Sequence, residues 1–339
     1  MNKKISIILI LTLLIITACT AGTKKSKDID VHIGLNGLMM EFLKNTPPQK
    51  VFEGDNFPVM IKVKNNGAYN IKDNPAVLSL GFERDYTKSA ALLQGGRVKQ
   101  VEGISGNAVE FTLQGRSKIN PNGEEEVISY NLKAGKIDPQ SEVHQSTIIA
   151  TLCYPYETEL SSTVCVDTDI NNLRPGKKVC NMQDLVFNNG QGAPIAVTKI
   201  ETNMMPLQLS EQSSASEKIK PQFLIYVENR GQGTAIKNEA VKDFCTKSDA
   251  SHENLNIVYL EAFLSGKRLN CQIDQFDKKQ ADNQPTHIKL KDKKDMIRCA
   301  LEEGISRTQD SYLAPLKVLL KYGYSQSISA NYLIQKPVS

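Results

Sequence analysis

The stretch Phe57–Gly67 reads FPVMIKVKNNG and decides the fold. Apolar side chains stand at positions 57, 59, 61 and 63, each separated by one other residue. Such alternation over eight residues is typical of a β-strand that buries one face. The Asn-Asn-Gly at its end is a turn signal. The stretch therefore predicts a half-buried strand that ends in a tight turn.

The same pattern returns at Phe223–Gly231 (FLIYVENRG). Two further segments repeat in the same order: VISYNLKAG at 127–135 parallels MIRCALEEG at 296–304, and 148–166 parallels 316–334. A fixed order with slowly drifting offsets predicts a duplicated domain. Chance similarity between amphipathic strands is the alternative.

The length of 339 residues suits two domains of ordinary size. Each repeat has about seven or eight short alternating segments, punctuated by Gly and Pro, and no long amphipathic helix. This pattern predicts an all-β protein with one β-sandwich per repeat. We place the first sandwich at residues 28–168, a turn-rich linker at 169–178 and the second sandwich at 179–339. Each half is large enough for its own core, so we expect each to fold separately.

The N-terminus indicates export. Residues 1–18 begin with a short basic region and continue with the apolar run Ile5–Ile16, which is too short for a membrane span of about 20 residues. The stretch Ile16–Cys19 (ITAC) resembles the lipobox of prokaryotic lipoproteins, which implies a diacylglycerol thioether on Cys19. Two acyl chains suffice for stable anchoring. The alternative is an ordinary signal peptide with an unrelated cysteine.

The polar, lysine-rich stretch at 19–27 predicts a flexible tether. We expect everything beyond it to lie at the extracytoplasmic face of the cell membrane, held there by the lipid.

A second resemblance concerns the repeated strand. The pattern Phe-x-Val-x-Ile-x-Val-x-Asn-x-Gly is similar to the tandem immunoglobulin-like domains called CARDB or S-layer-related domains, found in archaeal and bacterial surface proteins. It covers residues 30–335 loosely and is sharpest at Phe57–Gly67 and Pro221–Gly231. Together with the lipobox, it looks most like an archaeal cell-surface lipoprotein. It implies an immunoglobulin-like fold and transfers no catalytic residue. The chain departs from antibody-type domains, since it has no Trp.

Six cysteines remain after the anchor, an even number that predicts three disulfides in an exported chain. No pair has the Cys-x2-Cys spacing of a zinc site, so disulfides are favoured over a metal. These candidates are Cys153, Cys165, Cys180, Cys245, Cys271 and Cys299.

The repeat alignment also suggests pairings. It puts Ile148, Ala150, Leu152 and Tyr154 on the core face of a strand, with Cys153 pointing away. A hairpin centred on Glu159 would then place Cys153 opposite Cys165. The other four cysteines allow three pairings. Cys299 takes the core-face place of Tyr130, and Cys271 is its preferred partner.

The sequence predicts no catalytic residue, no metal site and no cofactor. It lacks the common nucleophile, zinc and phosphate-loop motifs, and its four His are scattered among polar residues. A Ser-His-Asp group assembled only in space stays open. Asp167, Asp169 and Asn171 have the oxygen ligands that calcium prefers, but they lack the Gly and Glu of an EF-hand loop, so a plain linker is favoured.

The net charge of +4 is too balanced over this length to indicate nucleic-acid binding. We therefore expect a non-catalytic surface protein that serves adhesion, envelope architecture or protein assembly. Its partners are the membrane and a protein or envelope polymer. The alternative is a membrane-presented carbohydrate- or peptide-binding module. Its aromatic candidates are Tyr154, Tyr156, Tyr322 and Tyr324, although alternation puts Tyr154 and Tyr322 in the core.

Overall fold

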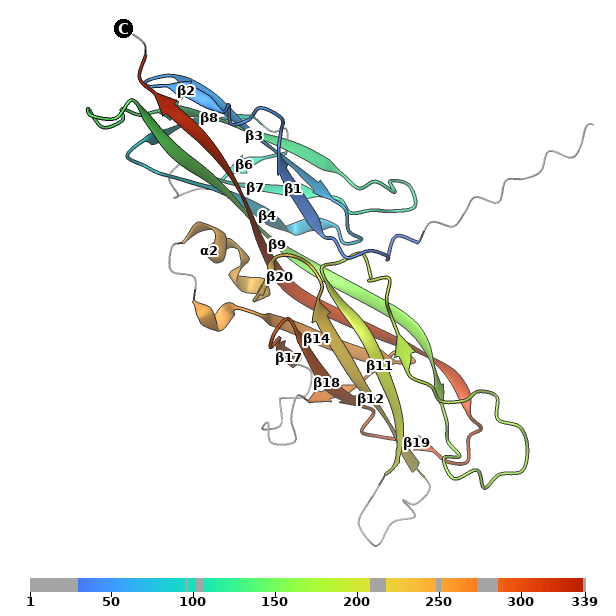
Figure 1. Ribbon diagram of the computed structural model, residues 1–339. Helices are drawn as coiled ribbons and strands as arrows, with labels where there is room; N and C mark the ends of the chain where they lie inside the picture. Colours follow the sequence, from blue (N-terminus) through green and yellow to red (C-terminus); the bar gives the residue numbers. More distant parts are fainter. Residues whose placement is uncertain are drawn as a thin grey trace, which may run out of the picture. The chain divides into compact units, whose positions relative to one another are not determined.

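The computed structural model describes residues 30–94, 97–101, 107–207, 218–247, 251–272 and 286–337 (Figure 1). Val31–Ser339 form one compact unit, distinct from Met1–Asp30. The described residues contain no helix long and apolar enough to cross a membrane. The described residues form three sheets that are almost entirely antiparallel, so the predicted all-β sandwich class is confirmed.

The first outer sheet has the order β1-β3-β8-β5. Its strands are β1 (Leu38–Phe42), β3 (Asn56–Asn65), β8 (Glu125–Ala134) and β5 (Thr87–Gln94). The predicted strand is β3, and its residues at positions 57, 59, 61 and 63 are all buried.

The second outer sheet has the order β10-β11-β12-β18-β16, with β19 (Ile305–Ser306) also on β12. Its strands are β10 (Leu185–Val186), β11 (Ile195–Pro206), β12 (Lys218–Asn229), β18 (Lys294–Ala300) and β16 (Asn270–Gln272). Apart from β10 and β19, this sheet repeats the first one strand for strand, as a duplicated domain requires.

A third sheet is shared by both repeats. Its order is β15-β14-β20-β9-β4-β7-β6, with β17 on β14 and with β13 and β2 on β20. Its long strands are β4 (Ile71–Phe82), β9 (Val143–Val166), β14 (Ile257–Leu264) and β20 (Tyr312–Gln335). Its short strands are β2 (Lys50–Phe52), β6 (Lys99–Gln100), β7 (Ala108–Leu113), β13 (Thr234–Ile236), β15 (Lys267–Arg268) and β17 (Thr286–Lys289).

The two repeats exchange strand halves along β9 and β20. Each strand is 24 residues long, and the two pair antiparallel over their whole length, with Tyr156 opposite Tyr322 near the centre. The first half of β9 also pairs with β4, and the first half of β20 pairs with β14. The second half of each strand therefore completes the sandwich of the other repeat (Figure 1).

A ring contact confirms this exchange. Tyr332, near the end of β20, lies 5.0 Å from Phe57 of β3 by ring centroids. The end of the chain thus packs in the first sandwich, whereas residues 157–166 pack in the second. Two halves cut at the linker would lose this ladder, so we now predict that residues 28–168 and 179–339 do not fold separately.

The predicted hairpin at Glu159 is wrong, because β9 runs straight through it. Its polar run belongs to the strand. Thr158 lies on the core face and donates to the Ile195 carbonyl at 2.7 Å. Glu159 lies on the other face and pairs with Lys317 of β20 at 3.1 Å. The core-face assignment of Ile148–Tyr154 was right, since its alternate residues are buried.

The cysteine pairing changes accordingly. Cys153 and Cys165 lie twelve residues apart on one extended strand, about 40 Å, which no disulfide spans. Cys153 pairs instead with Cys245, and Cys165 with Cys180. The remaining pair is Cys271–Cys299, as preferred from the sequence.

Candidate functional site

Four tyrosines meet at the centre of the shared strands, and we call them the tyrosine waist. Tyr154, Tyr156, Tyr322 and Tyr324 are all buried on one face of the β9–β20 pair. The centroids of Tyr154 and Tyr324 lie 5.7 Å apart, and those of Tyr156 and Tyr322 lie 6.1 Å apart. Because all four rings are buried, a sugar cannot stack on them. The prediction that these tyrosines are candidates for a carbohydrate site is therefore wrong.

The tyrosine hydroxyls hold loops from both repeats. The Tyr156 hydroxyl donates to the Gly192 carbonyl at 2.9 Å and accepts from the Tyr69 N–H at 3.3 Å. The Tyr324 hydroxyl accepts from the Gly233 N–H at 2.8 Å in the equivalent place. Burial raises the pKa of Tyr324 to about 12. These hydroxyls are protonated structural donors at neutral pH.

Contacts with these tyrosines explain why the Asn-x-Gly motif has Asn and Gly at its two fixed positions. The Asn65 side chain donates to the Tyr69 carbonyl at 2.8 Å and accepts from the Gly67 N–H at 3.1 Å. Asn229 repeats both bonds with Gly233 and Gly231. A Cβ on Gly67 would collide with the Tyr156 hydroxyl, and one on Gly231 with the Tyr324 hydroxyl. The motif therefore ends its strand where a tyrosine packs on the glycine.

The chain enters the described unit at the waist. The Gly34 N–H donates to the Asn189 carbonyl at 2.7 Å, and the Gly34 carbonyl accepts from the Gly192 N–H at 2.9 Å. The Arg116 guanidinium donates to the Val31 carbonyl at 2.9 Å and also to the Ile33 carbonyl. The segment that follows the expected anchor is thus bonded to both repeats. Cys19 itself lies outside the described residues.

The linker carboxylates are occupied by donors of the protein. Asp167 accepts from the Lys178 ammonium at 2.5 Å and from the Ser311 hydroxyl at 2.9 Å. Burial alone would raise the pKa of Asp167, but these bonds lower it on balance. Asp169 accepts backbone N–H groups of Arg174 and Leu173, at 3.0 and 2.9 Å, which lower its pKa.

A lysine ammonium already neutralises this linker, so the plain-linker interpretation is favoured over calcium. Asn171, the third oxygen candidate, is exposed. Within the residues that the structure describes, no group of three or more His, Cys, Asp or Glu has a geometry that could hold a metal. The contact of Lys178 with Asp167 is not predictable from the sequence, because spacing along the chain does not show that a lysine eleven residues away folds back onto Asp167.

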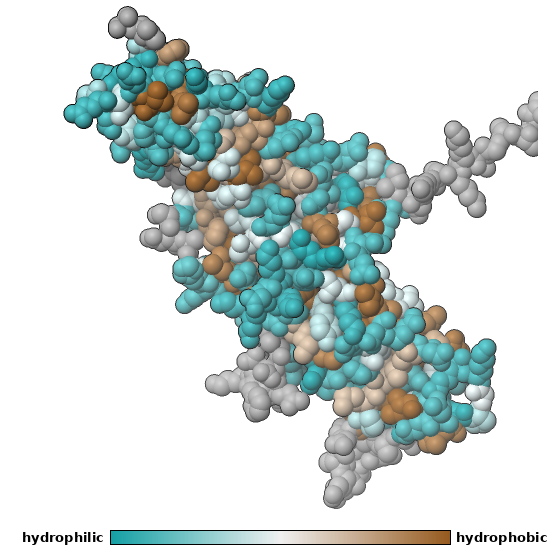
Figure 2. All heavy atoms as spheres, viewed as in Figure 1, coloured by the Kyte–Doolittle hydropathy of each residue, from teal (hydrophilic) through white to brown (hydrophobic). Residues whose placement is uncertain are grey.

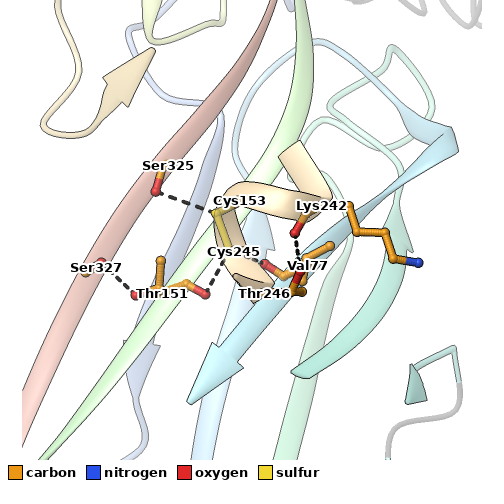
Figure 3. Close-up of a disulfide and its surroundings, with 8 residues drawn as sticks. All are labelled: Val77, Thr151, Cys153, Lys242, Cys245, Thr246, Ser325 and Ser327. Carbon is orange, nitrogen blue, oxygen red and sulfur yellow. Dashed lines mark hydrogen bonds between the residues drawn. A yellow bond between two sulfur atoms is a disulfide. The ribbon is translucent and has the colours of Figure 1, made fainter. Parts of the chain in front are cut away.

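A short helix covers the back of the shared sheet in the first sandwich. The helix α2 (Val241–Thr246) belongs to the second repeat, and the Cys153–Cys245 disulfide binds it to β9 (Figure 3). The Cys245 sulfur lies 3.5 Å from the Val77 carbonyl oxygen of β4. An apolar cluster is buried beneath the helix; it contains Val77, Val101, Ala108, Cys153, Ile236, Val241 and Cys245.

The same back face in the second sandwich has an open groove of about 490 Å³. It is lined by Ser161, Phe263, Gly266, Pro315, Leu316, Lys317 and Leu319. Ion pairs border it: Lys317 with Glu159 at 3.1 Å, and Arg268 with Glu261 at 3.0 Å. The groove suits an apolar side chain of a partner, with paired charges at its rim.

The group nearest to a Ser-His-acid arrangement is closed to substrate. The His144 ring stacks on Tyr86 at 3.7 Å between centroids, and its Nε2 lies 2.9 Å from a Glu83 oxygen. Ser146, two residues along β9, is fully buried. Its hydroxyl therefore meets no solvent from which a substrate would arrive.

Comparison with known proteins gives no family. No protein-family model matches the chain, and no curated protein matches it. Among solved structures, it is similar to a cohesin module from a Clostridium perfringens family 33 glycoside hydrolase, with 16% identity and a TM-score of 0.23 over 36% of this chain and 83% of that chain.

Two surface proteins are also similar in structure. The partial N-terminal region of the enterococcal surface protein has 7% identity and a TM-score of 0.19, over 85% of this chain and 84% of that chain. The Enterococcus faecalis MSCRAMM ACE has 9% identity and a TM-score of 0.18, over 90% and 95%. At such TM-scores, none of these similarities carries an argument about function.

Proposed function

We propose that the protein is a lipid-anchored, non-catalytic scaffold at the extracytoplasmic face of the cell membrane, and that it binds a protein partner there. The lipobox at Ile16–Cys19 and the three disulfides support export and anchoring. The sequence resemblance of the repeated strand to domains of archaeal and bacterial surface proteins is the further support for this location.

One observation carries the non-catalytic part of the proposal. Among the described residues, several chemically capable groups have structural roles: the waist tyrosines bind backbone groups of both repeats, Asp167 binds Lys178, and the Cys153–Cys245 disulfide joins β9 to the second repeat. Such a molecule is built for rigidity and presentation. We assign the partner to the groove beside Phe263, because an apolar centre with a polar rim is the usual anatomy of a protein interface. The second candidate, a peptide-binding module, would use the same groove.

The anchor is tested by the intact mass of protein extracted from membranes. We expect a diacylglycerol adduct on Cys19, and Cys19→Ser should leave an unprocessed or soluble form. An unmodified Cys19 in the membrane fraction would contradict the anchor.

The partner is tested with a photo-crosslinking residue in place of Phe263. A matched control carries the same residue in place of Met296, which is exposed on the outer sheet of the second sandwich. We expect one protein to crosslink at position 263 and not at 296. Equal labelling at both positions would contradict a specific groove.

A further inference from the structure

The segment Ile170–Gln183, which we call the clasp loop, displays apolar side chains to solvent. It leads from the end of β9 toward β10 and contains no helix or strand. Leu173 is 75% exposed and Val179 is 72% exposed. Beside the loop, Leu313 of β20 is 58% exposed. In Figure 1 the loop projects from the far end of the second sandwich, where Figure 2 shows apolar residues among hydrophilic ones.

The clasp loop is held firmly from beneath. The Cys165–Cys180 disulfide ties it to β9, and Leu313 of β20 is the register partner of Cys165, so Leu313 lies beside the attachment point of the loop. The Asp169 carboxylate accepts the N–H groups of Leu173 and Arg174. The Arg174 guanidinium donates to the Gln309 carbonyl at 2.6 Å. A loop fixed at this many points is preorganised, and preorganisation lowers the entropic cost of binding.

The charge of the loop has one sign. Residues 170–183 contain Arg174, Lys177 and Lys178, and no Asp or Glu. Arg174 pairs with Asp310 of the neighbouring segment at 3.4 Å and Lys178 neutralises the buried Asp167, whereas Lys177 is exposed. Apolar side chains next to an exposed cation match the chemistry of a bilayer surface with anionic headgroups. The apolar groups enter the acyl boundary, and the cation remains at the phosphates.

The position of the anchor allows this contact. From Cys19 to Val31 the chain spans at most about 40 Å when extended. From Pro155 at the waist to Val166 beside the loop, β9 extends about 36 Å. Because the chain enters at the waist, a lipid on Cys19 is close enough to bring the end of the second sandwich to the same membrane.

We propose that the clasp loop is a second membrane contact, in which Leu173, Val179 and Leu313 insert into an anionic bilayer. This inference rests on the proposed anchoring at Cys19. The protein would then be attached to the membrane at two points, the lipid on Cys19 and the clasp loop. Two points fix its orientation, with the second sandwich facing the membrane and the first sandwich facing away from it.

A fluorescence experiment tests the contact, since the chain has no Trp. Leu173→Trp places one indole in the loop of the mature chain that starts at Cys19. The free Cys19 thiol is coupled to a maleimide phospholipid in vesicles, while the other six cysteines stay oxidised. We expect a blue shift of emission and quenching by brominated acyl chains on vesicles with phosphatidylglycerol. Adding Lys177→Glu, or substituting Val179→Ser and Leu313→Ser, should reduce the quenching several-fold.

Phe52→Trp is the matched control, because Phe52 is 45% exposed on β2 in the first sandwich. We expect its indole to keep an aqueous emission spectrum. An unshifted indole at position 173, or an equal shift at position 52, would overturn the proposal. Equal insertion into purely zwitterionic vesicles would overturn its charge argument. Coupling supplies the anchor chemically, so a failure here is separate from an absence of lipid on Cys19 in cells. Circular dichroism and non-reducing peptide maps check that each variant folds.

Discussion

The hydrogen bonds of the tyrosine waist allow us to predict how much stability is lost when one hydroxyl oxygen, that of Tyr156, is removed. Tyr156→Phe removes a buried hydroxyl that donates to the Gly192 carbonyl and accepts from the Tyr69 N–H. Gly192 keeps a second donor, the Ala68 N–H at 2.9 Å, but the Tyr69 N–H has no other acceptor among the described residues. Leaving a buried donor unpaired costs about 1–3 kcal/mol, and the Tyr69 N–H is part-buried. We therefore expect the free energy of unfolding to fall by about 2 kcal/mol.

Tyr130→Phe is the matched control. Tyr130 lies on β8 and is as buried as Tyr156, but its hydroxyl has no hydrogen-bond partner among the described residues. Removing an unsatisfied buried hydroxyl relieves a desolvation cost, so we expect an effect near zero or a small stabilisation. The same substitution in two similarly buried rings thus separates hydrogen bonding from packing.

The assay is urea unfolding followed by circular dichroism with the disulfides intact. The midpoint should shift down for Tyr156→Phe and stay in place for Tyr130→Phe, with the same slope for both proteins. Equal shifts in the two variants would refute the reasoning, because the waist hydroxyl would then add no stability beyond the ring that carries it.

Three further outcomes follow from the same contacts. The raised pKa of Tyr324, about 12 against the ordinary 10, favours the folded state fully below pH 10; this stability is lost as the pH rises from 10 toward 12. Tyrosinate absorbance and circular dichroism should therefore change together on alkaline titration, and full ionisation of a still folded protein would contradict burial. Residues 31–168 or 179–339 alone should not melt cooperatively, whereas a chain cut at the exposed Gly176 should stay assembled after reduction, as size-exclusion chromatography with light scattering would show. Non-reducing peptide mapping should link Cys153 to Cys245; a Cys153–Cys165 peptide would contradict the continuous β9.

Local alternation predicted much of the fold. The residues of β3, β12 and the first half of β9 stand on the expected faces, because the period of a strand is two wherever it pairs. The same rule placed Cys299 in the core position of Tyr130, whereas Cys271 was only its preferred partner among three possible pairings; the structure has this pair. The buried face of a strand, the turn that ends it and the fold class depend on local sequence patterns, so they can be predicted from a single sequence.

Local alternation could not predict which strand β9 pairs with. The run Glu157–Glu159 was interpreted as a turn because it is polar, yet its two glutamates face lysines of β20 and Thr158 reaches a carbonyl of β11. These partners are more than 30 residues away in the sequence. The clasp loop escaped notice for the same reason. The exposure of its leucine and valine can be recognised only once β9 and β20 are known to bury most of the other apolar side chains of the two strands.

The register of β9 and β20 explains why two repeats became one unit. Tyr154 lies opposite Tyr324, and Tyr156 lies opposite Tyr322, so the repeated Tyr-x-Tyr meets its own copy across an approximate two-fold axis. The sheets on either side have the same strand order, which is the arrangement expected of an isologous dimer. If two identical chains exchanged these strand halves, the same backbone hydrogen bonds between the strands would form as in this chain. Fusing the two copies then replaces an intermolecular contact with an intramolecular one of high effective concentration. The two repeats differ at the back of the shared sheet, away from the two-fold axis: α2 covers one back face, and the other has the groove.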